Sequence, residues 1–231
     1  DLGMCLVALG KRDEAASLMN EVRAEKGIAA DSSVRICLLE TEVNRAAGSA
    51  DASVESAKAA VKLLTRSSPD DLRARCRLAL AEAYCDQGKP DEAGEELDEA
   101  GSLLKKSASS RKAMLQELTG RVLLLKGQAE PAAGQFDKAA AVLRDNEMLY
   151  GMARSLRKAG EAYEQAGKYQ FAADRYFQSG RSLFYGGNPQ EAKEMLARAL
   201  PAADKAGDAA LRAQIELLSA KIPPKEAARA L

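Results

Sequence analysis

The sequence predicts an all-α fold, an α-solenoid of about twelve helices arranged as six antiparallel pairs, and three observations predict it. First, glycines recur at steps of 38, 40, 39 and 40 residues, at Gly10, Gly48, Gly88, Gly127 and Gly167. Second, the intervals between them are rich in the strongest helix formers, and no run alternates with the period of two that predicts a strand. Third, residues of the same size recur at fixed distances from each glycine. Internal repetition of this kind is typical of solenoids.

The predicted helices follow from the breaks between them. Weaker breaks lie about midway between the five glycines, at Gly27, Ser67–Pro69, Ser107–Ser110 and Asp145–Asn146, and Gly187 and Gly207 continue at steps of 20 residues. Each interval between successive breaks predicts one helix, from residues 1–9 and 11–26 at the start to a last helix that ends before Pro223–Pro224, since proline cannot continue a helix. The chain begins at Asp1 inside a predicted first helix, so we expect a preceding segment to have been removed.

A pattern of small and large residues indicates how the two helices of a pair meet. A small residue recurs seven positions before each of the five glycines. A larger residue recurs nine positions after the glycine in four of the five repeats. The first set is Gly3, Thr41, Ala81, Gly120 and Gly160, and the second is Met19, Ala57, Leu97, Phe136 and Tyr176. A small residue lets two helix backbones approach, and the larger side chain fills the space beside them. The pattern predicts one antiparallel helix pair, repeated five times.

These positions resemble the tetratricopeptide repeat, whose pattern is a Leu-Gly pair, an aromatic residue, a turn glycine, an alanine, an aromatic residue and a second alanine. The matching residues include Leu80–Ala81, Tyr84, Gly88, Ala93, Leu97 and Ala100, and Ala159–Gly160, Tyr163, Gly167, Ala172, Tyr176 and Ser179. The resemblance covers nearly all of residues 1–220 but departs in its period of 38–40 residues rather than 34. Longer repeats of this type resemble helical sensor and scaffold domains of bacterial regulators. The repeat around Gly48, with Asn44 and Ala57, is the weakest match.

Composition excludes several classes of function. Lys+Arg and Asp+Glu are both 34, so there is no net charge to attract nucleic acid. The chain has no His, which removes the commonest general base and metal ligand, and its four cysteines show no C-x-x-C spacing. No phosphate-binding glycine motif is present, and the serine pairs 32–33, 67–68 and 109–110 are interpreted as helix caps. We therefore expect no enzyme, no cofactor, no metal site and no membrane span.

The resemblance implies a right-handed superhelix whose first helices line a concave groove that docks a peptide or protein segment. The exposed groove positions would include Arg45 and, as candidate partner-binding residues, Arg35, Arg75, Glu82, Arg121, Arg154, Arg157 and Glu161, with Tyr185 added from the aromatic cluster described next. Arginine at such positions suits carboxylates, so the expected partner is a protein or peptide, and the arginines favour an acidic one. The alternative interpretation is that these are ordinary solvated charges.

Eight of the ten aromatic residues lie between Tyr150 and Tyr185. They are either larger core residues of one repeat or the lining of a pocket. Because Tyr176–Phe177 and Phe184–Tyr185 are adjacent pairs, we expect at least one residue of each pair to face away from the core. The second hypothesis for function is accordingly a ligand-sensing repeat domain, with a small-molecule pocket near residues 163–185. A third is a structural spacer or self-assembly module, and a homo-oligomer is possible.

Domain organisation and compartment complete the expectations. Residues 1–222 are expected to form one repeat domain that is incomplete at its N-terminus, and residues 223–231 a tail or short cap helix. Unpaired cysteines favour a reducing compartment such as the cytoplasm, whereas a periplasmic protein or a lipoprotein would follow if a leader had been removed. The partner, the pathway and the oligomeric state stay open.

Overall fold

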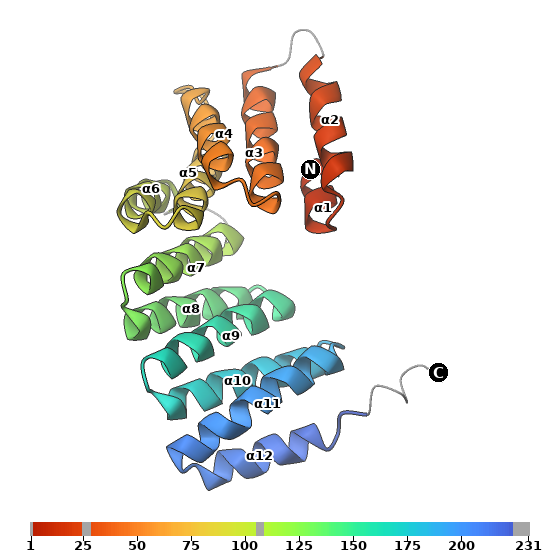
Figure 1. Cartoon of the computed structure of the whole chain (residues 1–231), viewed down its shortest axis with the longest axis vertical. Coiled ribbons are helices and arrows are strands. Elements are labelled where there is room, and N and C mark those ends of the chain that lie inside the picture. The colour runs from red at the N-terminus through yellow and green to blue at the C-terminus, as the bar shows by residue number, and fades with distance from the viewer. Residues whose placement is uncertain (1, 25–28, 105–108, 224–231) are drawn as a thin grey trace. The chain divides into compact units, whose positions relative to one another are not determined.

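The computed structural model describes residues 2–24, 29–104 and 109–223, and in these ranges the chain forms twelve α-helices and no strand (Figure 1). The all-α prediction of about twelve helices is therefore confirmed. The chain divides into two compact units, residues 1–111 and 112–231, and each is described by itself. None of the described helices is long and apolar enough to cross a membrane.

The first unit contains α1 (Leu2–Ala8), α2 (Arg12–Ala24), α3 (Ala30–Ala46), α4 (Ala50–Lys62), α5 (Asp70–Asp86) and α6 (Pro90–Leu103). Each helix packs on the next one along the chain, and α1 also contacts α3, as α3 contacts α5. Contacts between every second helix join one predicted pair to the following pair. The unit is thus a stack of antiparallel helix pairs, as the repeat predicts.

The second unit contains α7 (Ser109–Leu125), α8 (Ala129–Arg144), α9 (Leu149–Gln165), α10 (Tyr169–Tyr185), α11 (Pro189–Ala206) and α12 (Ala209–Ser219). The boundary between the two units lies in the first turn of α7. Here α10 packs extensively on both α9 and α11. The last helix ends at Ser219, just before Pro223, while residues 224–231 lie outside the described residues.

The periodic glycines end one helix and turn the chain into the next. All seven, at positions 10, 48, 88, 127, 167, 187 and 207, have φ between 69° and 81°, a left-handed conformation that favours glycine. At the break predicted at Asp145–Asn146, no glycine is available and Glu147 takes this conformation with φ of 58°. The predicted breaks at Gly27 and Ser107–Ser110 fall largely outside the described residues.

The core consists of the small and large residues that the repeat pattern selects. The five residues seven positions before the glycines are all buried, and so are the five residues nine positions after them. A Cβ atom placed on Gly120 would lie 2.8 Å from the Phe136 ring, and one on Gly160 would lie 2.8 Å from the Tyr176 ring. Close approach of the paired helices therefore depends on glycine at these positions, as predicted.

The first helix pair has the smallest share of the core, which predicts fast local opening. Gly3 is the buried residue of α1, and α2 buries Ala15 and Met19, whereas α10 buries seven residues. Since local opening is easiest where few apolar groups are buried, residues 2–24 should exchange their amide hydrogens faster than α9–α11. Hydrogen–deuterium exchange by mass spectrometry would measure this. Protection of residues 2–24 equal to that of α10 would contradict the expectation.

Candidate functional site

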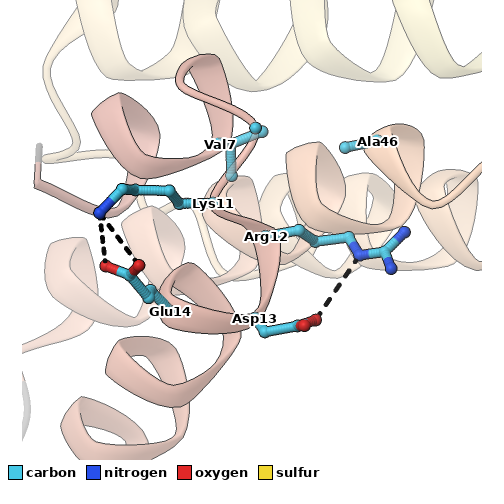
Figure 2. Close-up of a pocket in the computed structure, with 7 residues that line it drawn as sticks. Val7, Lys11, Arg12, Asp13, Glu14 and Ala46 are labelled. Carbon is cyan, nitrogen blue, oxygen red and sulfur yellow. Dashed lines mark hydrogen bonds and ion pairs between the residues drawn. The ribbon is translucent and has the colours of Figure 1, made fainter.

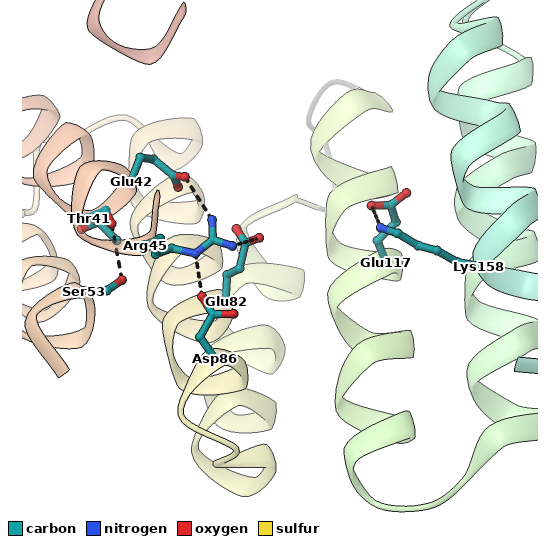
Figure 3. A network of polar contacts seen from close by, with 8 residues as sticks. All are labelled: Thr41, Glu42, Arg45, Ser53, Glu82, Asp86, Glu117 and Lys158. Atoms are coloured by element: carbon teal, nitrogen blue, oxygen red, sulfur yellow. Dashed lines mark hydrogen bonds and ion pairs between the residues drawn. The ribbon is translucent and has the colours of Figure 1, made fainter. Parts of the chain in front are cut away.

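Arg45 of α3 is the centre of a charged network in the first unit (Figure 3). Its guanidinium donates to Glu82 Oε1 at 2.6 Å and Asp86 Oδ2 at 2.8 Å on α5, and to Glu42 Oε2 at 3.0 Å. Burial acts to lower the pKa of Arg45, but the attraction of Glu82, with Asp86 and Glu42, outweighs it, and the pKa is raised. Arg45 and Glu82 were expected as groove residues, yet they bind each other and hold α3 to α5.

The same kind of pairing recurs in the second unit. Lys158 on α9 donates to Glu117 Oε2 on α7 at 2.8 Å, as the other part of Figure 3 shows. Arg175 donates to Asp137 at 2.7 Å, and Arg198 donates to Glu161 at 2.6 Å. Glu161, another expected partner-binding residue, is thus occupied by a residue of α11.

These pairs share one spacing along the chain. The partners of Arg45–Glu82, Asp137–Arg175, Arg198–Glu161 and Glu117–Lys158 are 37, 38, 37 and 41 residues apart. This spacing is one repeat, so the pairs join equivalent helices of neighbouring repeats. Opposite charges one period apart are visible in the sequence, and this signal would have identified the pairs. These four pairs, called the inter-repeat pairs below, therefore include some of the charged residues that were expected to line the groove.

The repeat around Gly48, the weakest match to the tetratricopeptide pattern, also has polar contacts between its helices. Asn44 donates to Ser56 Oγ at 2.9 Å and to the Ala52 carbonyl at 3.3 Å. The Ser53 hydroxyl donates to the Thr41 carbonyl at 3.4 Å across the α3–α4 contact (Figure 3). Hydrogen bonds here take the place of the bulky apolar pair found in later repeats.

Arg154 and Arg157 on α9 line one recess of the second unit, about 160 Å³ in volume, with Tyr150 and the α10–α11 residues Leu183 and Met195. Arg154 is exposed, and within the described chain no carboxylate lies at ion-pair distance from it. Arg157 lies 3.8 Å from the Glu161 carboxylate, which Arg198 already binds more closely. The two arginines therefore line the same recess, and within the described residues Arg157 has only this longer ion pair and Arg154 has none.

The opposite wall of this recess is acidic. Glu191 and Glu194 on α11 also line it, and Tyr150 donates its hydroxyl hydrogen to Glu191, with O–O distances of 3.2 and 3.3 Å. The recess therefore presents guanidinium groups on α9 and carboxylates on α11. A segment that carries both signs of charge complements it better than a purely acidic one.

Arg35 on α3 and Arg75 on α5 line a different pocket, in the first unit. Its volume is about 290 Å³, and most of its wall is apolar, from α1, α2 and α3: Leu2, Gly3, Met4, Leu18, Met19, Val22, Ile36 and Leu39. Burial lowers the pKa of Arg75, and the neighbouring positive charges of Arg111 and Arg35 lower it further. Arg75 thus has cations around it, unlike Arg45.

The two remaining expected residues lie apart from these sites. Arg121 on α7 is half-buried and already has a polar or electrostatic partner. Tyr185 at the end of α10 is 71% exposed, its ring edge-on to Phe184, but it does not line the Arg154 recess. The eight predicted residues are divided between the two units, with Arg35, Arg75 and Glu82 in the first and the other five in the second.

The eight aromatic residues of the cluster divide between core and surface: Tyr176 and Phe177 are buried, Tyr163, Tyr169 and Phe184 are half-buried, and Tyr150, Phe171 and Tyr185 are exposed. Tyr176 is 0% exposed and Phe177 is 8% exposed, so the expectation that one of these two faces away from the core is wrong. The reason is that α10 is covered on two sides, by α9 and α11, so adjacent positions are both buried. The expectation holds for Phe184–Tyr185, where Tyr185 is exposed. Tyr163 stacks on Phe171 at 5.3 Å and donates its hydroxyl to Asp137 at 3.0 Å.

Two other pockets contain no aromatic residue. One, about 320 Å³, lies among α8–α10 and is lined by polar side chains that include Asp137, Arg175 and Arg181. The other, about 460 Å³, lies at the α1–α2 turn beside Ala46 (Figure 2). Its charges pair along the chain, with Lys11 3.0 Å from Glu14 and Arg12 3.9 Å from Asp13.

The serine pairs and the buried Cys76 thiol are candidate nucleophiles, and all of them lie in helices or turns. Ser32 and Ser33 lie inside α3, and the N-cap of α5 is Pro69 without a side-chain bond, so the capping roles of serine pairs 32–33 and 67–68 are wrong. Ser68 instead accepts from the Thr65 backbone and donates to Asp31. Burial raises the pKa of the Cys76 thiol to about 12, which keeps it protonated. The described residues contain no cluster of three metal-ligating side chains.

Solved structures similar to the chain are helical repeat proteins. BtubC from P. vanneervenii has a TM-score of 0.70 and 14% identity, with 100% of this chain and 93% of that chain covered. A Rap protein complexed with competence and sporulation factor has a TM-score of 0.71 and 15% identity, with 95% and 72% covered. The TPR-like repeats of a putative kinesin light chain from Podosopora anserina have a TM-score of 0.62 and 20% identity, with 80% and 93% covered.

No protein-family model matches the sequence, and no curated protein matches it significantly. The likeness to the solved structures establishes the fold. The chain has a helical repeat fold of the tetratricopeptide type, as the small and large residues of its repeats predict.

Proposed function

We propose that the chain is a non-catalytic protein-interaction scaffold that docks a peptide or protein segment at the recess between α9 and α11. The observation that carries this proposal is the pair of arginines, Arg154 and Arg157, in a recess with Tyr150 and a partly apolar floor. Elsewhere on the helix faces, guanidinium groups such as those of Arg45 and Arg198 are already bound to carboxylates. The Rap structure with competence and sporulation factor shows that a fold of this type can hold a partner.

The chemistry of the recess defines the segment it suits. A carboxylate of the partner would receive charge-assisted hydrogen bonds from Arg154 and Arg157, each worth about 1.5–3 kcal/mol. A cationic or hydroxyl group beside that carboxylate would bind Glu194 on the facing helix. A recess of about 160 Å³ holds little more than one side chain, so most contacts of a longer segment would lie on the surrounding surface.

Replacing both Arg154 and Arg157 with Ala should weaken partner capture at least tenfold, because loss of about 1.4 kcal/mol already has that effect. The melting temperature should barely change, since exposed charges contribute little to stability. The measurement is a quantitative pull-down from source lysate, with melting followed by circular dichroism. A protein captured by the wild type counts as a candidate partner if the arginine double variant or either control variant depletes it.

Two double variants serve as controls. Lys62→Ala with Arg66→Ala removes the same charge from exposed positions of the first unit. Glu95→Ala with Glu99→Ala removes exposed acids of α6, whereas Glu96 is unsuitable because it accepts a 2.7 Å bond from Arg77. Both controls should capture normally. Loss of capture in the acidic variant, with retention in the arginine variant, would place the interface on α6 and overturn the assignment.

A further inference from the structure

The pocket of Arg35 and Arg75 has a composition that the proposed docking recess does not share. Eight residues of its wall are apolar or glycine, and the polar part of the wall consists of Ser32, Arg35 and Arg75. Ser32 and Arg35 are three residues apart on α3, one helix turn, so they lie on the same face of that helix. Arg75 comes from α5, one repeat later. The pocket is thus an apolar recess with hydrogen-bond donors along one part of its wall.

The two arginines have no carboxylate of their own. The one acidic side chain among their charged neighbours, Asp71, receives two bonds from Arg111, of which the Nη2–Oδ2 bond measures 2.6 Å. Neither Arg35 nor Arg75 has an ion pair within the described residues, and Arg75 is half-buried among positive charges. Arg35, Arg75 and Arg111 thus act on a single carboxylate, that of Asp71, which Arg111 binds, and the excess of positive charge favours binding of an anion.

The surroundings favour a compact anion over a long segment. Leucine, methionine, valine, isoleucine and glycine make up most of the wall, so it offers few groups that could bind the polar backbone of an extended peptide. A volume of about 290 Å³ has room for about ten groups the size of a water molecule, at roughly 30 Å³ each.

We propose that this pocket is a binding site for a small aliphatic monocarboxylate, whose chain lies against Leu18, Val22 and Leu39 and whose carboxylate binds Arg35 and Arg75. The site lies wholly within the first unit and is independent of the Arg154 recess. Guanidinium groups can bind a carboxylate in a two-pronged manner, and Ser32 can donate a further bond. The apolar wall contributes affinity in proportion to the buried length of the chain.

The test is titration of the 231-residue protein by isothermal calorimetry with octanoate, acetate and 1-octanol. We expect octanoate to bind at least tenfold more tightly than either of the other two. Acetate lacks the long aliphatic chain, and 1-octanol lacks the carboxylate. Replacing both Arg35 and Arg75 by Met keeps an apolar side chain at each position and should lower the affinity for octanoate at least tenfold. Higher salt should weaken binding to the wild type, because part of the attraction is between charges.

Controls separate this site from the proposed docking recess. The Arg154→Ala, Arg157→Ala protein should bind octanoate as the wild type does, and the Arg35→Met, Arg75→Met protein should capture the protein partner normally. Circular dichroism confirms that each variant is folded. Equal affinity of wild type and Arg35→Met, Arg75→Met for octanoate, or 1-octanol binding as tightly as octanoate, would overturn the proposal. Tighter binding of an acetylated tripeptide ending in leucine would also overturn it and identify a peptide terminus as the occupant.

Discussion

Gly160→Leu is expected to destabilise the second unit by about 3 kcal/mol, at the upper end of the range for overpacked cores. The new side chain would start 2.8 Å from two carbons of the Tyr176 ring. Tyr176 is fully buried, and its hydroxyl donates to Glu164 at 3.0 Å, so the ring has no free space to enter. Relief requires α9 and α10 to move apart. Urea unfolding followed by circular dichroism measures the loss.

Gly134→Leu is the matched control. Gly134 lies in α8 of the same unit, and a Cβ atom placed there meets nothing within 4 Å. Because glycine is a poor helix former, this substitution should stabilise by roughly 0.5–1 kcal/mol. Equal effects of the two substitutions would show that the close approach of α9 and α10 at Gly160 does not exist.

Arg45→Ala should cost the first unit about 2–3 kcal/mol, below the full penalty for breaking a buried ion pair because the pair is partly exposed. The Arg45 side chain is 20% exposed and binds three carboxylates. Its removal takes away the cation that Glu42, Glu82 and Asp86 share, and the repulsion among these three carboxylates then lowers stability. The free energy of unfolding in urea, at low ionic strength, measures the effect.

A second substitution identifies the cause of that loss. Adding Glu82→Gln to Arg45→Ala should recover part of the stability, because one of the repelling charges disappears. Lys58→Ala, which breaks an exposed pair with Glu55 within one helix, should cost about 0.5 kcal/mol or less. If Arg45→Ala is as mild as Lys58→Ala, the inter-repeat pairs do not hold the repeats together.

Local rules account for the part of the fold that could be predicted from the sequence. The turns require a left-handed backbone, which glycine adopts, and in two of the helix pairs a glycine seven residues before the turn faces an aromatic ring nine residues after it, as Gly120 faces Phe136 and Gly160 faces Tyr176. Both requirements concern neighbours within one helix pair and leave a periodic pattern. The burial of Phe177 depends instead on a third helix, α11, and a two-helix repeat unit contains no such information.

The availability of the candidate charges could not be predicted from single positions, because it depends on contacts between neighbouring repeats. Glu82 and Glu161 are correctly placed on the first helices of their repeats, yet each meets an arginine 37 residues away. Whether a surface charge is available depends on the neighbouring repeat. Opposite charges one period apart are the signal for these two pairs, and the other six candidate residues, Arg35, Arg75, Arg121, Arg154, Arg157 and Tyr185, stay predictions.

Site-specific photo-crosslinking tests most directly the claim that partner binding depends on the arginines left free by the inter-repeat pairs. A photoreactive phenylalanine replaces the exposed Tyr150 in the wall of the recess, or the residue at exposed position 66 or 95, and each protein is irradiated in source lysate. The account predicts a discrete adduct from position 150, lost when Arg154 and Arg157 are both replaced by Ala, and no adduct from the other two positions. An adduct from position 95, with none from position 150, would contradict it.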